Sequence, residues 1–277
     1  MQQTTELVQT PAVVPSQRLR SYGRTLIEVV LPPLAFFIVL LALWEILVDV
    51  REIPAIILPK PSAIIRRLAE EPGYFFIENG LITFYEALAG FAVAAVTGIG
   101  SAALMARSRI IERTFFPLAI VIKATPIIVI APLLVIWGGY GPAPKVIMAA
   151  LLCYFPIMVN TIIGLRSVNP TSLEFFQSVA ASDLEIFYRL RAPHSLPYVI
   201  SAFKTSASLA VIGAVVAEWA GAGQGLGRVV FLMASYLDQE GVFAGIVVLA
   251  AMGILLTALV GWLERRLLHW HESMIVG

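Results

Sequence analysis

Four charged side chains interrupt the long apolar runs of this chain or lie at their ends: Glu86, Lys123, Lys204 and Glu218. An ionised group at the middle of a bilayer costs about 2.5 to 3.5 kcal/mol, so such a residue usually faces a cavity or a partner. Lys123 precedes Pro126 by one helical turn, which suggests a solute path, with snorkelling to the interface as the alternative. We predict that Lys123, Pro126 and Glu218 belong to such a path, with an interfacial anchor as the alternative for Glu218.

The glycine-rich run Gly221-Ala222-Gly223-Gln224-Gly225-Leu226-Gly227 could suggest a phosphate-binding loop. A nucleotide-binding loop of that kind ends in Gly-Lys-Ser or Gly-Lys-Thr and follows a strand, and this run has neither feature. We find no ATPase motif elsewhere in the sequence. An ATP-driven cycle would therefore depend on a separate subunit.

Catalytic and metal-binding chemistry finds little support in the sequence. The single cysteine, Cys153, excludes an intrachain disulfide and a multi-cysteine metal site. His269 and His271 are two positions apart and would not share a helix face. Because no nucleophile and base converge, we predict no catalytic residue, no metal site and no bound cofactor. The net charge of +1 gives no indication of a nucleic-acid partner.

The composition predicts an all-α integral membrane protein, because 59% of the residues are hydrophobic and 13% are charged. An average soluble domain has about 25% charged residues. A membrane span needs about 20 mostly apolar residues. Six spans are predicted within a membrane domain over residues 27–265: 27–48, 81–106, 115–137, 145–165, 196–219 and 242–263. Residues 1–26 and 266–277 are predicted to be tails.

Two of these spans have special composition. The second is rich in alanine and glycine, which allow helix backbones to approach closely in lipid, so we expect it to be buried among other helices. The third carries Pro117, Pro126 and Pro132 and should be kinked or interrupted.

The distribution of lysine and arginine predicts the orientation in the membrane. With both termini in the cytoplasm, the inside segments carry eleven of these residues and the outside segments carry six. The eleven are Arg18, Arg20, Arg24, Arg107, Arg109, Arg113, Arg166, Arg189, Arg191, Arg265 and Arg266. The six are Arg51, Lys60, Arg66, Arg67, Lys145 and Arg228. Residues 166–195 are therefore expected on the cytoplasmic side.

That polar stretch is predicted to form two short helices with a bend between them. Thr171 and Glu174 form one potential capping box, and Ser182 and Glu185 form a second. The second helix is expected to stop before Pro193. The simplest alternative is an amphipathic loop that packs on its own bundle.

From Glu174 the sequence reads EFFQSVAASDLEIFYRLRAP, which resembles the signature cytoplasmic loop of bacterial binding-protein-dependent ABC importer permeases. Five residues match the spacing of the family's Glu, Gly, Ile, Leu and Pro positions: Glu174, Ala180, Leu190, Ala192 and Pro193. Phe175 and Phe176 replace an alanine pair. The alanine at the glycine position requires a bend without positive φ, or with strain.

The resemblance implies the type I importer permease fold, in which this loop is a coupling helix that contacts an ATPase subunit. It places seven residues at or near that contact: Glu174, Ala180, Ser182, Asp183, Phe187, Arg189 and Pro193. It also implies a bacterial inner-membrane location, two cytoplasmic ATP-binding subunits that use the ATP, an extracytoplasmic solute-binding protein, and a second permease copy in a homodimer.

Three other segments are similar to one branch of that family: residues 58–62, 124–133 with Trp137-Gly138, and 155–161. The branch imports nitrate, sulfonates, taurine, thiamine-precursor pyrimidines and riboflavin. Within this branch, the three segments are most similar in sequence to the pyrimidine and riboflavin permeases. The resemblance thus implies riboflavin or a thiamine-precursor pyrimidine as the solute. The alternatives are a nitrate, sulfonate or taurine permease and a stand-alone secondary transporter.

Overall fold

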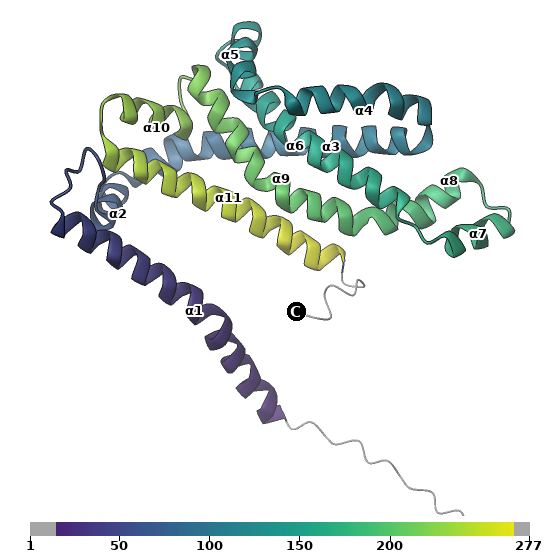
Figure 1. Ribbon diagram of the computed structural model, residues 1–277, viewed down its shortest axis with the longest axis horizontal. Helices are drawn as coiled ribbons and strands as arrows, with labels where there is room; N and C mark the ends of the chain where they lie inside the picture. Colours follow the sequence, from purple (N-terminus) through teal and green to yellow (C-terminus); the bar gives the residue numbers. More distant parts are fainter. Residues whose placement is uncertain (1–14, 269–277) are drawn as a thin grey trace, which may run out of the picture. The chain divides into compact units, whose positions relative to one another are not determined.

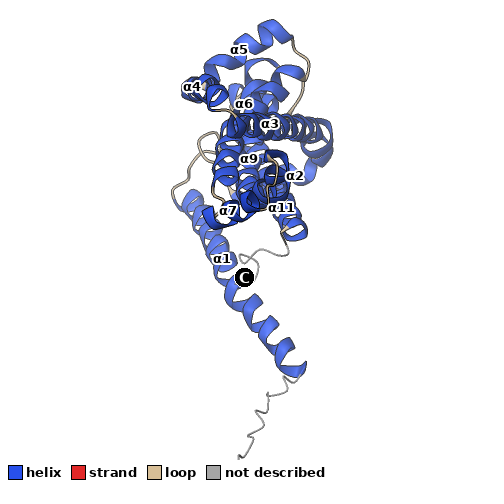
Figure 2. Cartoon of the chain, turned by 90° about the vertical axis from the view of Figure 1, so that its right-hand side faces the viewer, coloured by secondary structure: helices blue, strands red, loops and turns tan. Residues whose placement is uncertain are grey.

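The computed structural model describes residues 15–268, with side chains from residue 31 onward. The regular secondary structure of this range is helical throughout (Figure 2). The chain divides into two compact units, residues 1–62 and residues 63–277, which are described separately.

The first unit is dominated by the long helix α1 (Pro15–Val50). The helix begins twelve positions before the expected start of the first span at residue 27, so residues 15–26 are helical and not an extended tail. After α1 the chain folds back, and residues 60–62 contact the last turns of that helix. The Ser62 hydroxyl donates a hydrogen bond to Glu45 at 2.6 Å, and Lys60 forms an ion pair with Asp49.

The second unit is a bundle of helices (Figure 1). Its elements are α2 (Pro61–Glu70, which starts in the first unit), the π-helix η1 (Gly73–Gly80), α3 (Leu81–Arg107), α4 (Arg109–Ala124), α5 (Ile127–Gly138), α6 (Ala143–Arg166), α7 (Pro170–Ser178), α8 (Asp183–Ile186), the π-helix η2 (Phe187–Arg191), α9 (Ala192–Gly221), α10 (Leu226–Ser235) and α11 (Gln239–Leu267). Figure 1 shows α7 and α8 at one end of this unit and α10 at the other.

Helices α3, α6 and α9 form the core of the bundle around Ala149 on α6. A β-carbon added to Gly90 of α3 would lie 2.4 Å from the Ala149 β-carbon, and one added to Gly213 of α9 would lie 2.6 Å from the Ala149 α-carbon. Both glycines are therefore required by the close approach of the backbones. The second predicted span packs one face, which includes Ala87, Gly90 and Ala94, against other helices of this chain. Its opposite face, which includes Val93 and Val96, is exposed, so the span is buried on one side only.

Five of the described helices are long and apolar enough to span a membrane, and a bent pair gives a sixth candidate. That pair is α4 and α5, which meet at an angle of 99°, so the third predicted span, residues 115–137, is interrupted as its prolines indicated. The break lies at Thr125-Pro126, because Pro126 has no N–H to continue the hydrogen-bond ladder of α4. Pro117 and Pro132 lie inside α4 and α5, so a single proline interrupts the span.

The prediction that the second short helix stops before Pro193 is wrong. Residues 183–221 run as one helical stretch through η2 into α9. The Ala192 N–H bonds the carbonyl of Phe187, five residues back. This wider turn relieves the clash that a proline ring causes in a regular α-helix and leaves Pro193 in the first turn of α9, where it needs no donor.

Candidate functional site: the α7–α8 segment and a buried polar network

The α7–α8 segment, residues 167–191, connects α6 to α9 at the end of the bundle where α3 also ends (Figure 1). Its first helix begins differently from the prediction. The Asn169 side chain accepts a hydrogen bond from the Thr171 N–H at 2.9 Å, and Pro170 occupies the first turn. The expected capping box of Thr171 with Glu174 is thus wrong, because a stronger cap two positions earlier starts the helix.

The turn between the two helices is a Schellman motif closed by an alanine. The Ala180 N–H bonds the Gln177 carbonyl at 2.9 Å, and the Ala181 N–H bonds the Phe176 carbonyl at 3.0 Å. Ala180 has φ of 54°, in the left-handed region that glycine usually occupies at this position. Of the two possibilities left open by the sequence, the structure shows the strained bend.

The second capping box is confirmed. The Ser182 side chain accepts a hydrogen bond from the Glu185 N–H at 3.3 Å, and the Glu185 carboxylate accepts one from the Ser182 N–H at 2.9 Å. Two backbone groups are thereby satisfied at the start of α8, which fixes its direction after the turn.

Six of the seven predicted contact residues lie on the α7–α8 segment, and the seventh, Pro193, lies in the first turn of α9. All of the seven except Phe187 are exposed to solvent, and Phe187 is half-buried. The exposed ones are Glu174, Ala180, Ser182, Asp183, Arg189 and Pro193. The apolar residue that anchors α8 to the bundle is Ile186, which is 6% exposed.

Four large apolar side chains of the same segment were not singled out as contact residues. Phe175, Val179, Leu184 and Tyr188 are 58 to 65% exposed. The amphipathic pattern could not identify them, because it does not say which apolar side chain faces the bundle. A segment with this much exposed apolar surface outside the spans is suited to contact a protein partner.

A polar network lies at the other end of the bundle. Glu218 of α9 is fully buried and accepts a hydrogen bond from the Thr83 hydroxyl at 2.6 Å and another from the Gly227 N–H. Thr83 in turn accepts one from the Leu226 N–H at 2.8 Å. The glycine-rich run is therefore tied to α3 and α9. A β-carbon on Gly225, where φ is 114°, would lie 2.2 Å from Glu218, so only glycine fits.

Two further charged side chains, Glu86 of α3 and Lys145 of α6, are buried in the bundle. Glu86 is 4% exposed, and one oxygen of its carboxyl group is buried without a hydrogen-bond partner among the described residues. Lys145, 2% exposed, donates to the carbonyls of Tyr140 and Gly141, both at 2.7 Å. Lys145 was not predicted to be an interior residue, because it stands at the start of the fourth span and was counted among the outside basic residues.

The three predicted path residues are separated. Lys123 is exposed near the end of α4 with its ammonium group 4.5 Å from the ring centre of Phe155, and Pro126 is exposed at the α4–α5 break. Glu218 belongs to the buried network and is enclosed on all sides by other residues of this chain. Their role in a solute path stays a prediction. Among the described residues, no group of three metal-ligating side chains is present.

Residues 94–269 match the family profile of the binding-protein-dependent transport system inner membrane component. The chain is 37% identical over 243 residues to the formylaminopyrimidine transport permease protein of Halalkalibacterium halodurans, covering 88% of this chain and 97% of that protein. It is 30% identical to the riboflavin transport system permease protein of Chloroflexus aurantiacus, covering 84% and 88%.

Solved structures with the same fold include an inward-facing conformation of the MetNI methionine ABC transporter. The TM-score is 0.62 over 71% of this chain and 98% of that chain, with 15% sequence identity. At this identity the likeness describes the fold alone. The fold is that of type I importer permeases, as the loop motif implied.

Proposed function

This chain belongs to the family of binding-protein-dependent ABC importer permeases, and we propose that it carries a thiamine-precursor pyrimidine or a similar heteroaromatic solute across the membrane. Support comes from the two relatives whose printed names refer to a formylaminopyrimidine and to riboflavin. Taurine is the alternative solute, since the taurine transport permease of Escherichia coli is 28% identical over 85% of this chain.

The α7–α8 segment is the proposed contact with the ATPase subunit. The observation that supports it best is the rigid corner made by the Ala180 turn and the Ser182 capping box, with apolar side chains exposed on both helices. Because η2 continues directly into α9, a push on the corner would be passed to the core helix of the bundle. Such a contact lets ATPase closure bias the bundle between two conformations.

The proposed assembly has two ATP-binding subunits, an extracytoplasmic solute-binding protein and two copies of this chain as a homodimer. The orientation is the one predicted from the lysine and arginine count, with both termini and the α7–α8 segment in the cytoplasm. ATP hydrolysis belongs to the partner subunit, and no catalytic residue or cofactor is proposed for this chain.

Coupling is tested by changing one exposed side chain of the α7–α8 segment. Tyr188→Asp should reduce co-purification of the ATPase and solute-stimulated ATP hydrolysis at least tenfold, because it puts a charge into a protein contact that needs apolar cover. Glu174→Lys and Asp183→Lys should each weaken docking by adding an unpaired or repelling charge. Tyr236→Asp is the matched control, since Tyr236 is 80% exposed and follows α10 at the other end of the bundle.

Normal ATPase co-purification by all three α7–α8 variants would contradict the coupling role. The solute is tested separately, with the complex reconstituted in proteoliposomes with its binding protein. Uptake of a labelled formylaminopyrimidine should exceed that of taurine. The reverse order would assign the chain to the sulfonate and taurine group while leaving the permease function intact.

A further inference from the structure

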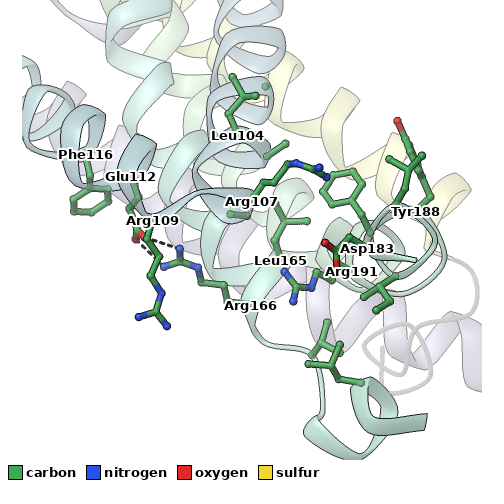
Figure 3. A pocket seen from close by; sticks show the side chains of 18 of the residues that line it. Leu104, Arg107, Arg109, Glu112, Phe116, Leu165, Arg166, Asp183, Tyr188 and Arg191 are labelled. Atoms are coloured by element: carbon green, nitrogen blue, oxygen red, sulfur yellow. Dashed lines mark hydrogen bonds and ion pairs between the residues drawn. The ribbon is translucent and has the colours of Figure 1, made fainter. Parts of the chain in front are cut away.

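A pocket of about 1180 Å³ lies between the bundle and the α7–α8 segment (Figure 3). Its lining comes from the C-terminal part of α3, the start of α4, the end of α6, and from α7, α8 and η2. The proposed ATPase contact uses the outer side chains of that segment. The chemistry of the pocket is a separate question.

The polar part of the lining is strongly cationic. Five arginines and two carboxylates border it: Arg107, Arg109, Arg113, Arg166, Arg191, Glu112 and Asp183. Arg166 and Glu112 neutralise each other through two hydrogen bonds of 2.7 Å, drawn as dashed lines in Figure 3. Among the described residues, no ion pair joins the other four arginines to an acidic side chain. The pocket therefore keeps a net charge of +3 when empty.

The remaining lining is apolar and lies farther along the spans. Gly100 and Leu104 are one to two turns before the end of α3, and Phe116 and Pro117 are two turns into α4. Leu104 is 58% exposed, and a β-carbon added to Gly100 would meet nothing within 4 Å. Space thus continues from the arginines along an apolar wall.

We propose that this pocket binds an anionic phospholipid, with the phosphate group among the arginines and the start of an acyl chain along Gly100, Leu104 and Phe116. Arginine binds phosphate oxygens through two parallel hydrogen bonds, and basic pockets between spans on the cytoplasmic side bind acidic headgroups. A soluble phosphate would satisfy the arginines but would leave the apolar wall uncovered. The lipid therefore fits both zones.

We assign the bound lipid to the cytoplasmic leaflet of the membrane, and this assignment rests on the orientation proposed above. The binding itself is measured in detergent, where neither orientation nor transport matters, so the two proposals can fail separately.

The test is native mass spectrometry of the purified chain, titrated with phosphatidylglycerol, phosphatidylcholine or inorganic phosphate. We expect phosphatidylglycerol to bind and phosphatidylcholine not to bind at the same concentration. Arg107→Gln with Arg113→Gln should weaken phosphatidylglycerol binding about twenty-fivefold, since each basic residue near an acidic headgroup contributes about a factor of five. The pair Arg107→Lys and Arg113→Lys should retain most of the binding, because the charge is kept.

Two further variants isolate the site. Gly100→Phe keeps every charge and should lower binding by filling the apolar zone, because a β-carbon at this position meets nothing within 4 Å. Arg265→Gln is the matched control, because Arg265 is an exposed arginine at the end of α11 and does not line the pocket. It should leave binding unchanged. Thermal unfolding of each variant checks that the chain is folded.

Three results would overturn the proposal. Equal phosphatidylglycerol binding by the wild type and a folded Arg107→Gln, Arg113→Gln variant would exclude the pocket. Displacement of phosphatidylglycerol by an equal concentration of inorganic phosphate would make the site one for a soluble anion. If the double variant changed only the dimer fraction in size-exclusion chromatography, the pocket would be an interface between copies of the chain.

Discussion

Ala180 shows how a single side chain can keep a turn at an energetic cost. Its φ of 54° places the β-carbon close to the following carbonyl oxygen, which costs roughly 1 to 2 kcal/mol for any residue except glycine. The Schellman hydrogen bonds at residues 180 and 181 hold it there. The turn therefore adopts the left-handed conformation that glycine usually takes at the end of a helix, although the residue is alanine.

We predict that Ala180→Gly stabilises the α7–α8 segment by about 1 kcal/mol, because the strain at positive φ is removed. Hydrogen exchange of the amides over residues 176–186 should slow about fivefold. Ala181→Gly is the control, because Ala181 is outside the left-handed region and gains only disorder in the unfolded chain. Equal effects of the two substitutions would show that the bend carries no strain.

The helices are positioned by contacts that leave no room for side-chain variation. In α3, Gly90 lies against the backbone of α6, whereas Gly100 of the same helix has open space beside it. Association of helices in a bilayer depends on this kind of packing, since lipid is as apolar as leucine. The two glycines thus separate the effect of packing from the effect of helix propensity.

Gly90→Ala should lower the stability of the bundle by about 1 to 3 kcal/mol, since the new methyl group overlaps Ala149 and the Val146 carbonyl. Gly100→Ala should cause no loss. Thermal unfolding of the purified variants in one detergent measures the difference. If the two variants unfolded at the same temperature, the close approach of α3 and α6 would be incorrect.

For the whole molecule, the orientation that we propose places the α7–α8 segment and the glycine-rich run on opposite sides of the membrane. Helix α9 connects them. Ser178, at the end of α7, and Gln224, three positions after α9, are both exposed. In a Cys153→Ala background, Gln224→Cys should react with an impermeant thiol reagent in intact cells. Ser178→Cys should react with the same reagent only after the cells are permeabilised. Labelling of both from the same side would contradict the six-span topology.

Cys153→Ala removes the thiol of the single cysteine in the sequence, so only the introduced cysteine can be labelled. In the wild type, Cys153 is fully buried between helices and its thiol donates to the Ser206 carbonyl. Alanine occupies a smaller volume at this site, so the loss of stability should be modest, about 1 to 2 kcal/mol.

The sequence by itself determined the features that depend on local hydropathy and on hydrogen bonds between near neighbours. These include the apolar spans, an interruption within the third span and the Ser182 capping box, each confirmed in the structure. Which of the three prolines interrupts the span, Pro126, came from the structure. They are predictable because the lipid core demands internal hydrogen bonding of each span, and because a cap involves residues only three positions apart. The start of α7 was missed where two local caps competed.

Only the tertiary structure decided which distant residues meet. Thr83 and Glu218 are 135 positions apart, and a hydrogen bond joins them. Thr83 also accepts a hydrogen bond from the Leu226 N–H, so the glycine-rich run that could suggest a phosphate-binding loop is part of a buried network. The five arginines of the pocket come from four separate helices. The helical period predicts which residues share one face of a helix, but it does not predict which other helix that face contacts. The close packing of α3, α6 and α9 around Ala149 decides those contacts.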